Sequence, residues 1–278
     1  MIKLFSLPNT WHIAKALGEV MPYRVKEYAS GGFCIIVEKE ISPLDEVLII
    51  GNLDLPNLME FISLLDAVIR AGAKKVALIV PYLGCARQDK MEMPYSSVGF
   101  EIVIRILNLF DSYRLITFDV HNPKILQAFS GRIINLSTSF IFKEEIDQYK
   151  KITPDALVLA PDLGSYRRIK NTYPDAAYLN KTRIGNDIEF SSQYSFQGKD
   201  VILLDDILDS GKTIRGALDF VYQAGANSIY AFVTHLAGNH IPKEVIATTD
   251  SLGKREGVQQ VRIADLLKSL MAQTLAIA

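Results

Sequence analysis

The chain has 278 residues, of which 49% are hydrophobic and 22% charged, a balance that is typical of a folded globular protein and excludes a disordered one. Because this length exceeds what one small core needs, we expect one large or two medium-sized domains. The 30 basic and 31 acidic side chains leave a net charge of −1, which argues against a nucleic-acid-binding protein but allows a local basic cluster around a small phosphorylated ligand.

The N-terminus and the two cysteines bear on where the protein works. The N-terminal segment has no basic stretch followed by an apolar core, so we expect no signal peptide. No apolar run approaches the ~20 residues that a membrane-spanning helix needs. Cys34 and Cys85 each lie in an apolar stretch and share no metal-ligand spacing, which predicts buried thiols in a reducing compartment. We therefore expect a cytoplasmic protein with no membrane partner.

The first half of the chain predicts alternating strands and helices. Residues 47–50 are a short, fully apolar run, typical of a strand that is buried on both faces of a parallel sheet. From Leu58 to Ile69, apolar residues recur every three or four positions and predict an amphipathic helix, which Gly72 can end. Residues 76–80 predict the next buried strand and complete a β-α-β unit.

This alternation continues to the C-terminus and predicts an α/β fold with mostly parallel sheets. The last helix, which begins at Ile263, is amphipathic and is expected to pack back across the molecule. The other expected elements are a helix near 97–110, strands at 115–118, 157–160, 201–204 and 229–234, and a helix at 213–223.

Residues 66–80 and 219–233 are similar to one another. Both contain Asp, Val, Ala-Gly-Ala and a final Val at constant spacing, and both follow a strand, a loop and the start of a helix. The similarity indicates either two domains of like topology or a helix-to-strand turn that is common in such folds.

A duplication would divide the chain near the polar residues 140–152, into domains at 1–145 and 146–278. The loop 51–56 would then take the place of the loop 205–213 without its chemistry. In that case the second half holds the ligand, and the first half is mainly a partner surface.

The segment DDILDSGKT, residues 205–213, ends like a nucleotide-binding P-loop. A Walker A loop has a glycine five positions before Gly211, and here that position is Asp206, whose carboxylate would repel a phosphate. We therefore exclude a P-loop. The backbone N–H groups at 210–214 nevertheless open a helix, where they can bind a phosphate.

The side chains of this loop are suited to a sugar phosphate. Ser210 and Thr213 add hydroxyl donors and Lys212 adds a positive charge. Asp205 and Asp206 follow a parallel strand at the edge where ligands bind in α/β sheets, and their oxygens can accept hydrogen bonds from ribose hydroxyls. The alternative is a helix with an N-cap after an acidic turn.

Polar side chains also follow other predicted strands. In residues 81–90, Arg87 can pair with a phosphate and Gln88 can contact the edge of a base. Asp119 and His121 could hold a divalent cation, although a single histidine after a strand is more often structural. Asp162 follows the strand at 157–160, and Lys181 and Arg183 stand two apart after another strand. We expect these strand ends to form one site.

Together these segments resemble the ribose-phosphate diphosphokinases, the phosphoribosyl pyrophosphate (PRPP) synthetase family, over nearly the whole chain. PYLGCARQDK is similar to the family's P-Y-x-x-x-A-R-Q-D-[RK], a pattern that is highly specific to it, and DDILDSGKT resembles its PRPP loop. DVHNPKILQAF resembles the family's D-L-H motif, and VLAPDLGSYRR its segment with a metal-binding aspartate. NKTR resembles the K-x-R of its catalytic loop.

The resemblance implies an activity and a fold. The activity is transfer of the β,γ-diphosphoryl group of Mg-ATP to the C1 hydroxyl of ribose 5-phosphate, giving PRPP and AMP. The fold is two type-I phosphoribosyltransferase-like domains with mostly parallel sheets flanked by helices, the first carrying ATP and subunit contacts and the second ribose 5-phosphate. The resemblance also implies Mg²⁺ as cofactor and a homo-oligomer built from dimers, with a hexamer as one option.

The same resemblance implies roles for individual residues. Lys181 and Arg183 would stabilise the transferring diphosphoryl group. The other implied roles are metal binding by His121, Asp162 and Asp119; ATP binding by Arg87, Gln88, Asp89, Tyr28 and Ser30; and ribose 5-phosphate binding by Asp205, Asp206, Asp209, Ser210, Gly211, Lys212 and Thr213.

Three features depart from the family pattern. The family's adenine-side loop, F-x-D-G-E, is here YASGG at 28–32, without either carboxylate. In the family this loop reaches a neighbouring subunit, so its change affects both ATP binding and assembly. Lys212 replaces a small residue, and the chain is shorter than typical members.

Two other functions compete with PRPP synthesis. A phosphoribosyltransferase that consumes PRPP would share only the motif in the second half, so the motifs around Arg87, His121 and Lys181 argue against it. A non-catalytic regulatory subunit of the same family is favoured by the lost acids at 28–32 and opposed by the retained Lys181 and Asp162.

Overall fold

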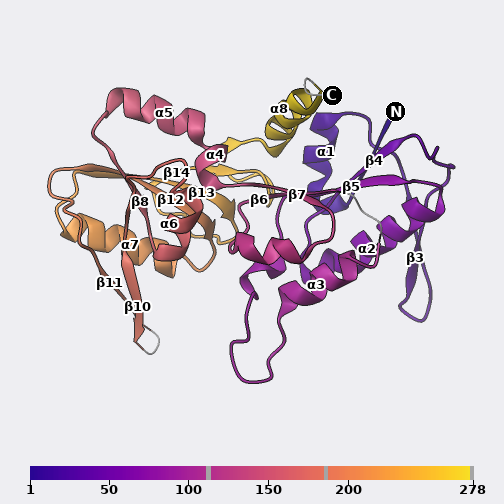
Figure 1. Cartoon of the computed structure of the whole chain (residues 1–278), viewed down its shortest axis with the longest axis horizontal. Helices are drawn as coiled ribbons and strands as arrows, with labels where there is room; N and C mark the ends of the chain where they lie inside the picture. The colour runs from indigo at the N-terminus through magenta and orange to yellow at the C-terminus, as the bar shows by residue number, and fades with distance from the viewer. Residues whose placement is uncertain (111–113, 185–186, 276–278) are drawn as a thin grey trace. The chain divides into compact units, whose positions relative to one another are not determined.

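The computed structural model describes residues 1–110, 114–184 and 187–275, and the chain divides into two compact units (Figure 1). Unit 1 consists of Met1–Asn135 together with the last helix, and unit 2 of Leu136–Arg262. Among the helices in these described ranges, none is long and apolar enough to cross a membrane.

Unit 1 is built on a five-stranded sheet of order β1-β4-β5-β6-β7, in which the pairs from β1 to β6 are parallel. Its strands are β1 (Ile2–Ser6), β4 (Glu46–Ile50), β5 (Lys75–Val80), β6 (Arg114–Phe118) and β7 (Arg132–Leu136), with the separate antiparallel pair β2 (Arg24–Glu27) and β3 (Phe33–Ile36). Its helices are η1 (Pro8–Thr10), α1 (Trp11–Leu17), α2 (Leu55–Arg70), η2 (Gly84–Arg87), α3 (Gly99–Leu107), η3 (Pro123–Ala128) and α8 (Ile263–Leu275).

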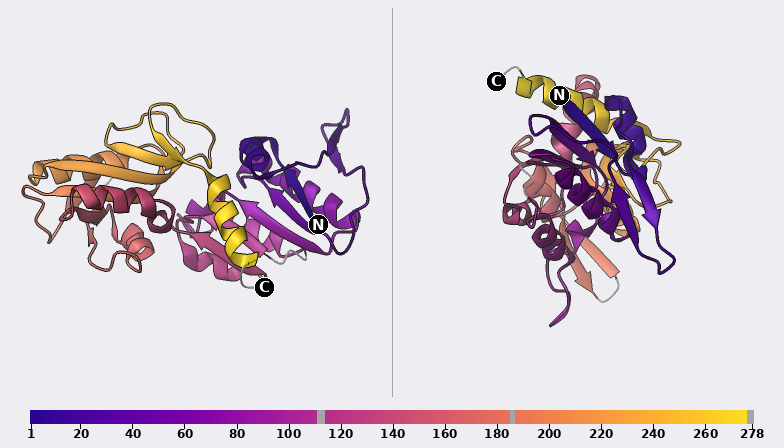
Figure 2. Two further views of the ribbon diagram at one scale, coloured as in Figure 1. Left: turned by 90° about the horizontal axis from the view of Figure 1, so that it is seen from above. Right: turned by 90° about the vertical axis from the view of Figure 1, so that its right-hand side faces the viewer.

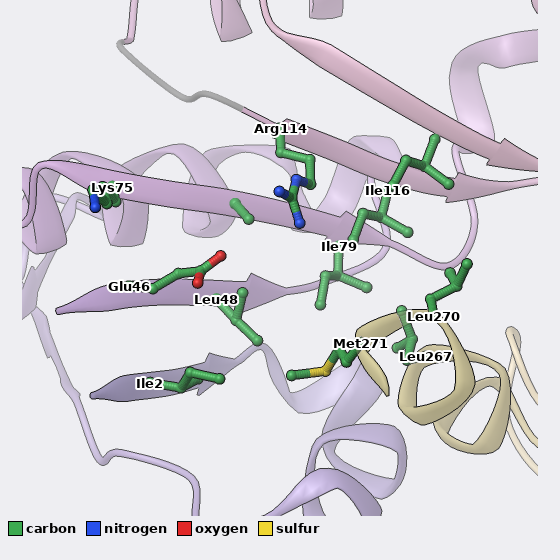
Figure 3. A pocket seen from close by; sticks show the side chains of 12 residues that line it. Ile2, Glu46, Leu48, Lys75, Ile79, Arg114, Ile116, Leu267, Leu270 and Met271 are labelled. Carbon is green, nitrogen blue, oxygen red and sulfur yellow. The ribbon is translucent and has the colours of Figure 1, made fainter. Parts of the chain in front are cut away.

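The two faces of the unit 1 sheet are covered differently. One face packs against α2 and α3, where Phe61, Phe100 and Ile104 join the apolar strand residues in one buried core. The other face lies under α8, and between them is a cavity of about 480 Å³ lined by apolar side chains such as Ile79 and Leu267 (Figure 3). Helices on both faces satisfy the need of a parallel sheet to be buried on each side.

Unit 2 is built on a six-stranded parallel sheet of order β15-β14-β13-β12-β8-β9. Its strands are β8 (Leu157–Ala160), β9 (Ala177–Tyr178), β12 (Asp200–Leu208), β13 (Ser228–Leu236), β14 (Val245–Thr249) and β15 (Gln259–Val261), with the antiparallel hairpin β10 (Asn180–Ile184) and β11 (Asp187–Ser191) beside them. Its helices are α4 (Thr138–Ile141), α5 (Lys143–Ile152), α6 (Leu163–Ile169) and α7 (Lys212–Gln223).

Two views of the ribbon show that each unit has helices beside its own sheet (Figure 2). In unit 2, Ile214 and Val221 of α7 pack into the core on one face. Phe142 and Tyr149 lie against Phe232 of β13, with ring centroids 5.5 and 6.0 Å apart. The predicted α/β fold with mostly parallel sheets flanked by helices is therefore confirmed.

The predicted strands and helices form, with ends that shift by a few residues. The largest change is in β12, which extends from the predicted 201–204 to Asp200–Leu208 because its second half stays paired with β13. The two similar segments each run from a helix into a strand, and Gly72 and Gly225 adopt φ of 114° and 90° where the helices end.

The compact units do not coincide with the predicted ranges 1–145 and 146–278. They divide between Asn135 and Leu136, and α8 belongs to unit 1. The polar segment at 140–152, which we expected at a domain boundary, is helical, and α5 buries Ile146 while Lys143 and Asp147 form an exposed i,i+4 ion pair.

The two cysteines differ in burial. Cys85 is buried as predicted, and this burial raises the pKa of its thiol to about 12. The prediction is wrong for Cys34, which is only partly buried because it lies in the β2–β3 hairpin rather than in the core, and its sulfur accepts a hydrogen bond from the Tyr28 hydroxyl.

Candidate active site

The loop 209–213 joins β12 to the N-terminus of α7. Gly211 caps the helix in a left-handed conformation, with φ 78°. An added Cβ there would lie 2.6 Å from Arg215 Nη2, which donates a hydrogen bond of 2.6 Å to the carbonyl oxygen of Ser210. Lys212 and Ser210 are exposed at the first turn of α7, and the N–H of Lys212 donates to Ser210 Oγ at 3.5 Å. The first N–H groups of a helix have no partner within the helix and can donate to an anion, and Lys212 and Arg215 add positive charge nearby. This arrangement can bind a phosphate.

The loop that follows β13 packs against the loop 209–213. Gly238 follows β13, and its N–H donates to the carbonyl of Leu208 at 2.9 Å. A Cβ at this glycine would lie only 2.0 Å from the carbonyl oxygen of Asp209. The backbone path of the phosphate loop therefore depends on a glycine nearly thirty residues further along the chain.

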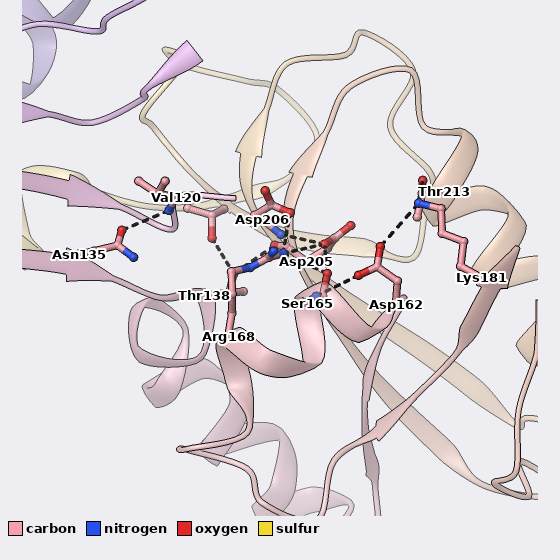
Figure 4. A network of polar contacts seen from close by, with 11 residues as sticks. Val120, Asn135, Thr138, Asp162, Ser165, Arg168, Lys181, Asp205, Asp206 and Thr213 are labelled. Carbon is pink, nitrogen blue, oxygen red and sulfur yellow. Dashed lines mark hydrogen bonds and ion pairs between the residues drawn. The ribbon is translucent and has the colours of Figure 1, made fainter. Parts of the chain in front are cut away.

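Asp205 and Asp206 lie within β12 and are both buried, with 6% and 3% of their surfaces exposed. Arg168 of α6 lies between them. Its Nη2 is 2.6 Å from Asp206 Oδ1 and 3.3 Å from Asp205 Oδ1, and only 3% of its side chain is exposed. The buried acid pair is therefore partly neutralised by one buried guanidinium (Figure 4).

Asp205 is held by further hydrogen bonds. Its Oδ1 accepts from the Ser165 hydroxyl at 2.8 Å and from the backbone N–H of Asp206 at 3.0 Å. Burial raises the pKa of Asp205 well above its ordinary value, repulsion by Asp206 adds to this, and Arg168 opposes both. The pair is thus fixed in orientation and costly to charge.

Lys181 approaches the phosphate loop from β10. Its Nζ lies 2.9 Å from Thr213 Oγ1 and 3.5 Å from Asp162 Oδ2 (Figure 4). The hairpin is held to α7 because Phe190 of β11 packs on Gly216, where a Cβ would meet the ring at 2.7 Å. The docking of the β10–β11 hairpin on α7 therefore positions Lys181 beside the phosphate loop.

Asp162 caps the N-terminus of α6. Its Oδ1 accepts a hydrogen bond of 2.9 Å from the backbone N–H of Ser165. Burial alone would raise the pKa of this carboxyl, but that hydrogen bond and the charges of Lys181 and Arg168 outweigh it and hold the pKa below its ordinary value. Asp162 is therefore a carboxylate at neutral pH, within reach of Lys181.

Arg183 lies in β10, where its backbone pairs with Ile188, and its side chain lies outside the described residues. Its role stays a prediction. In the same hairpin the backbone of Lys181 pairs with that of Phe190.

The predicted ATP-binding residues Arg87, Gln88 and Asp89 lie in and after η2 of unit 1. Arg87 and Gln88 are exposed. Asp89 Oδ2 accepts a hydrogen bond of 2.8 Å from Asn122 Nδ2, which joins this segment to the loop that carries His121. The structure thus brings together two motifs that are more than thirty residues apart in sequence.

Asp119 and His121 differ in exposure. Asp119 is buried at the end of β6 and has a positive φ of 42°, which is uncommon for a residue other than glycine, whereas His121 is exposed. The next residue, Val120, is fixed by a hydrogen bond from its N–H to Asn135 Oδ1 at 3.1 Å (Figure 4). His121 is the more exposed of the two residues of this motif.

Tyr28 and Ser30 lie in the turn of the β2–β3 hairpin. The turn closes through a hydrogen bond of 2.8 Å from the Tyr28 N–H to the carbonyl of Gly32. Tyr28 is exposed, and Lys26 lies 5.4 Å from the centre of its ring. The aromatic ring is thus presented to solvent on an arm that projects from unit 1 (Figure 1).

Comparisons with known proteins decide the family. The N-terminal domain of ribose phosphate pyrophosphokinase matches residues 6–110, and the phosphoribosyl transferase domain matches residues 156–265. The ribose-phosphate pyrophosphokinase of Methanobrevibacter smithii is 31% identical, over 81% of each chain. That of Porphyromonas gingivalis is 33% identical, over 76% of this chain and 69% of that protein. The chain belongs to the ribose-phosphate pyrophosphokinase family.

Two further relatives extend the match over the whole chain. Ribose-phosphate pyrophosphokinase 1 of Streptococcus pyogenes serotype M1 is 28% identical, over 96% of this chain and 92% of that protein. The crystal structure of phosphoribosylpyrophosphate synthetase from Mycobacterium smegmatis has a TM-score of 0.83 at 21% identity and covers 100% of this chain and 99% of that one, which shows a shared fold. The predicted family and fold are confirmed.

The described carboxylates could contribute to a Mg²⁺ site without forming the whole of it. Among the described residues, no three His, Cys, Asp or Glu side chains gather to hold a metal ion. Mg²⁺ is commonly held by one or two carboxylates, waters and substrate phosphates, so a full protein cage is not needed. The Asp162 carboxylate, charged and partly exposed, has the chemistry for such a role.

Sequence reasoning missed three residues that shape this pyrophosphokinase site. Arg168 and Ser165 orient the acid pair from one face of α6, and Gly238 supports the phosphate loop. The spacing of Asp162, Ser165 and Arg168, each three apart, could have indicated one face of a helix that begins at the aspartate. No pattern in the sequence marked Gly238.

Proposed function

We propose that this chain transfers the diphosphoryl group of Mg-ATP to the C1 hydroxyl of ribose 5-phosphate, giving PRPP and AMP. The contact between Lys181 and Thr213 carries the proposal, because it places a cation over the phosphate loop of a chain that belongs to this family. The match at residues 6–110 is to a pyrophosphokinase domain and does not favour a PRPP-consuming phosphoribosyltransferase.

Different residues of the described chain have separate roles in this proposed reaction. The N-terminus of α7 binds the 5-phosphate, with Ser210, Lys212 and Thr213 adding donors and charge, and Asp205 and Asp206 accept hydrogen bonds from the ribose hydroxyls. The C1 oxygen forms a bond to the β-phosphorus of ATP as the bond to the α-β bridging oxygen breaks, and the hydroxyl proton passes to solvent. Lys181 stabilises the negative charge on the transferring group.

Asp162, Asp119 and His121 are the residues proposed to hold Mg²⁺, which when bound would neutralise negative charge on the transferring phosphates. Arg87, Gln88 and Asp89 are proposed to bind ATP, together with Tyr28 and Ser30. These assignments rest on the motifs and on the exposure of Arg87 and His121. The proposed catalytic partner of Lys181 is Arg183.

The direct test is to incubate the chain with Mg-ATP and ribose 5-phosphate and to measure AMP and PRPP by chromatography. We expect equal amounts of both products, and removal of divalent metal by a chelator to abolish them. Formation of ADP in place of AMP, or no product over a range of metal and phosphate concentrations, would contradict the proposal. The second outcome favours the regulatory subunit.

A glycine variant tests the phosphate loop. Gly211→Ala places a side chain at φ 78°, which costs about 1–2 kcal/mol, and forces Arg215 to move. We expect the KM for ribose 5-phosphate to rise about tenfold, equivalent to ~1.4 kcal/mol of binding. Gly198→Ala is the control, because Gly198 has φ 66° with nothing near its Cβ position. Equal KM values for the two variants would exclude the loop as the phosphate site.

Oligomerisation and location are also proposals. Val25, Tyr28 and Phe33 of the β2–β3 hairpin are exposed apolar side chains, which supports a homo-oligomer formed from dimers through this arm. The balanced charge supports small-molecule substrates and no nucleic acid. We place the protein in the cytoplasm, where both substrates are made.

A further inference from the structure

Three neighbouring loops lie at the C-terminal end of the unit 2 sheet. β12, β13 and β14 are adjacent and parallel, so the loops that follow them, 209–213, 237–244 and 250–258, leave the same end of the sheet in this order. The first of these is the phosphate loop described above. The second packs against it, and the third carries Arg255.

The middle loop, 237–244, is closely fitted to the phosphate loop. The N–H groups of Ala237 and Gly238 both donate to the carbonyl oxygen of Leu208 at 2.9 Å. An added Cβ at Gly238 would lie 2.0 Å from the carbonyl oxygen of Asp209. Protein segments that are packed this tightly transmit a displacement to their neighbours. A shift of Gly238 is therefore expected to displace the backbone of the loop 209–213.

Arg255 holds the middle loop on both sides of Gly238. Its Nη2 donates to the carbonyl oxygen of Leu236 at 3.1 Å, and its Nη1 donates to Asn239 Oδ1 at 3.4 Å. In sequence, one acceptor precedes Gly238 and the other follows it. A planar guanidinium presents its donors in a fixed fork, so this one side chain constrains both ends of the short segment.

The backbone around Arg255 is itself held in place. The Arg255 N–H donates to Gln260 Oε1 at 3.0 Å. Gln260 Nε2 in turn donates to the carbonyl oxygens of Thr249 at 3.2 Å and Gly253 at 3.0 Å. One glutamine side chain thus joins several points of the loop 250–258, and the half-buried Arg255 extends to the middle loop from a fixed backbone.

Stability alone does not account for this arginine. Both acceptors of its side chain are uncharged oxygens, and within the described residues its Nε is buried without a hydrogen-bond partner. A charged group that is partly buried with an unpaired donor is unfavourable for folding. Such a group in a folded protein calls for a specific explanation, and a role at the neighbouring phosphate loop supplies one.

We infer that Arg255 is a positioning residue for the binding of ribose 5-phosphate. It fixes the segment 236–239, Gly238 passes this constraint to Asp209, and the phosphate loop is thereby kept in the conformation that binds the 5-phosphate. Arg255 acts through these two loops and not by contact with the substrate. The inference rests on the proposed function, which assigns the loop 209–213 to ribose 5-phosphate.

The first test is Arg255→Met, which keeps a long side chain and removes its donors. We expect the KM for ribose 5-phosphate to rise about tenfold, the effect of losing one charge-assisted hydrogen bond. The KM for ATP and kcat should change less than about twofold, because the loop binds the 5-phosphate equally in the ground state and the transition state. Lys254→Met is the matched control, since Lys254 is exposed and carries the same charge next to Arg255. It should leave all three constants unchanged.

Arg255→Lys separates positioning from charge. An ammonium keeps the positive charge but cannot contact Leu236 and Asn239 with the two arms of a fork. We therefore expect this variant to recover little of the lost affinity for ribose 5-phosphate. Full recovery would show that positive charge alone is needed and would overturn the positioning role.

A double-mutant cycle tests the route through the middle loop. Asn239→Ala removes one of the two acceptors from an exposed position, and we expect it to raise the KM for ribose 5-phosphate about threefold. Because both substitutions break the same connection, Arg255→Met combined with Asn239→Ala should bind no more weakly than Arg255→Met alone. A product of the two single effects, about thirtyfold, would contradict a shared route.

Val258→Ala is the control for stability. Val258 packs against the core of unit 2 at the end of the loop 250–258, so its truncation lowers the Tm without removing a donor or acceptor of Arg255. The KM for ribose 5-phosphate should not change. An equal rise in this KM in Val258→Ala and Arg255→Met would show that the effect is a loss of stability, and this result or an unchanged KM in Arg255→Met would refute the inference.

Calorimetry with ribose 5-phosphate alone separates this inference from the proposed function. If the wild type makes PRPP and Arg255→Met binds ribose 5-phosphate as tightly as the wild type does, the positioning role is wrong and the function stands. If Arg255→Met binds about tenfold more weakly and the wild type forms no PRPP, the positioning role stands and the function is wrong.

Discussion

Lys181→Ala is expected to lower kcat for PRPP formation by about 10²–10³-fold, the usual cost of removing one preorganised group that stabilises transition-state charge. Lys181 Nζ lies 2.9 Å from Thr213 Oγ1, at the mouth of the phosphate loop, so it is already in place before substrate binds. The KM for ribose 5-phosphate should change much less than kcat, because the 5-phosphate is held mainly by the N-terminus of α7.

The measurement is steady-state kinetics of AMP release, with thermal unfolding to show that the variant folds. Lys199→Ala is the control, since Lys199 is an exposed lysine of unit 2 that precedes β12. Full turnover by Lys181→Ala would remove the catalytic role of this residue. An equal loss in the Lys199→Ala variant would show that the effect is one of overall charge.

The sequence predicted the fold well because its strands are buried on both faces. Runs such as Val47–Ile50 and Val201–Leu204 are apolar throughout, as is typical of strands in a parallel sheet that helices cover on both faces. The hairpin of β10 and β11 was not predicted as a structure. Its residues are largely polar, and its contacts with α7, such as Phe190 against Gly216 and Phe220, join segments that lie far apart in sequence and that no local pattern encodes.

The candidate site was predicted where one short segment carries the chemistry. Ser210 to Thr213 form the helix N-terminus that the residue types indicated, and Asp205 and Asp206 stand beside it. What could not be predicted are contacts between distant segments. Arg168 contacts Asp206, which is 38 residues further along the chain. Asp89 accepts a hydrogen bond from Asn122, which is 33 residues further along. Such contacts are set by sheet order and helix packing rather than by spacing.

Arg168→Met is expected to destabilise unit 2 by about 3–5 kcal/mol, because it leaves two buried carboxylates without their cation. The guanidinium is almost fully buried and lies within 3.3 Å of both Asp205 and Asp206. Arg168→Lys should fall between the wild type and Met, since an ammonium keeps the charge but lacks the planar guanidinium whose Nη2 contacts both carboxylates. Urea unfolding measures the differences, with the exposed Arg167→Met as control.

The loss of stability in Arg168→Met is also expected to depend on pH. The pKa of Asp205 is raised in the folded protein, mainly by burial, so the folded state binds a proton more readily than the unfolded state. The stability that this contributes is present at acid pH and is lost as pH rises through the raised pKa. Without Arg168 the pKa rises further. The cost of Arg168→Met is therefore largest above the raised pKa of Asp205 and shrinks as the pH falls through that pKa and the carboxyl becomes protonated. A cost that grows on acidification, or one no larger than that of Arg167→Met, would show that Arg168 does not serve to balance the charge of this pair.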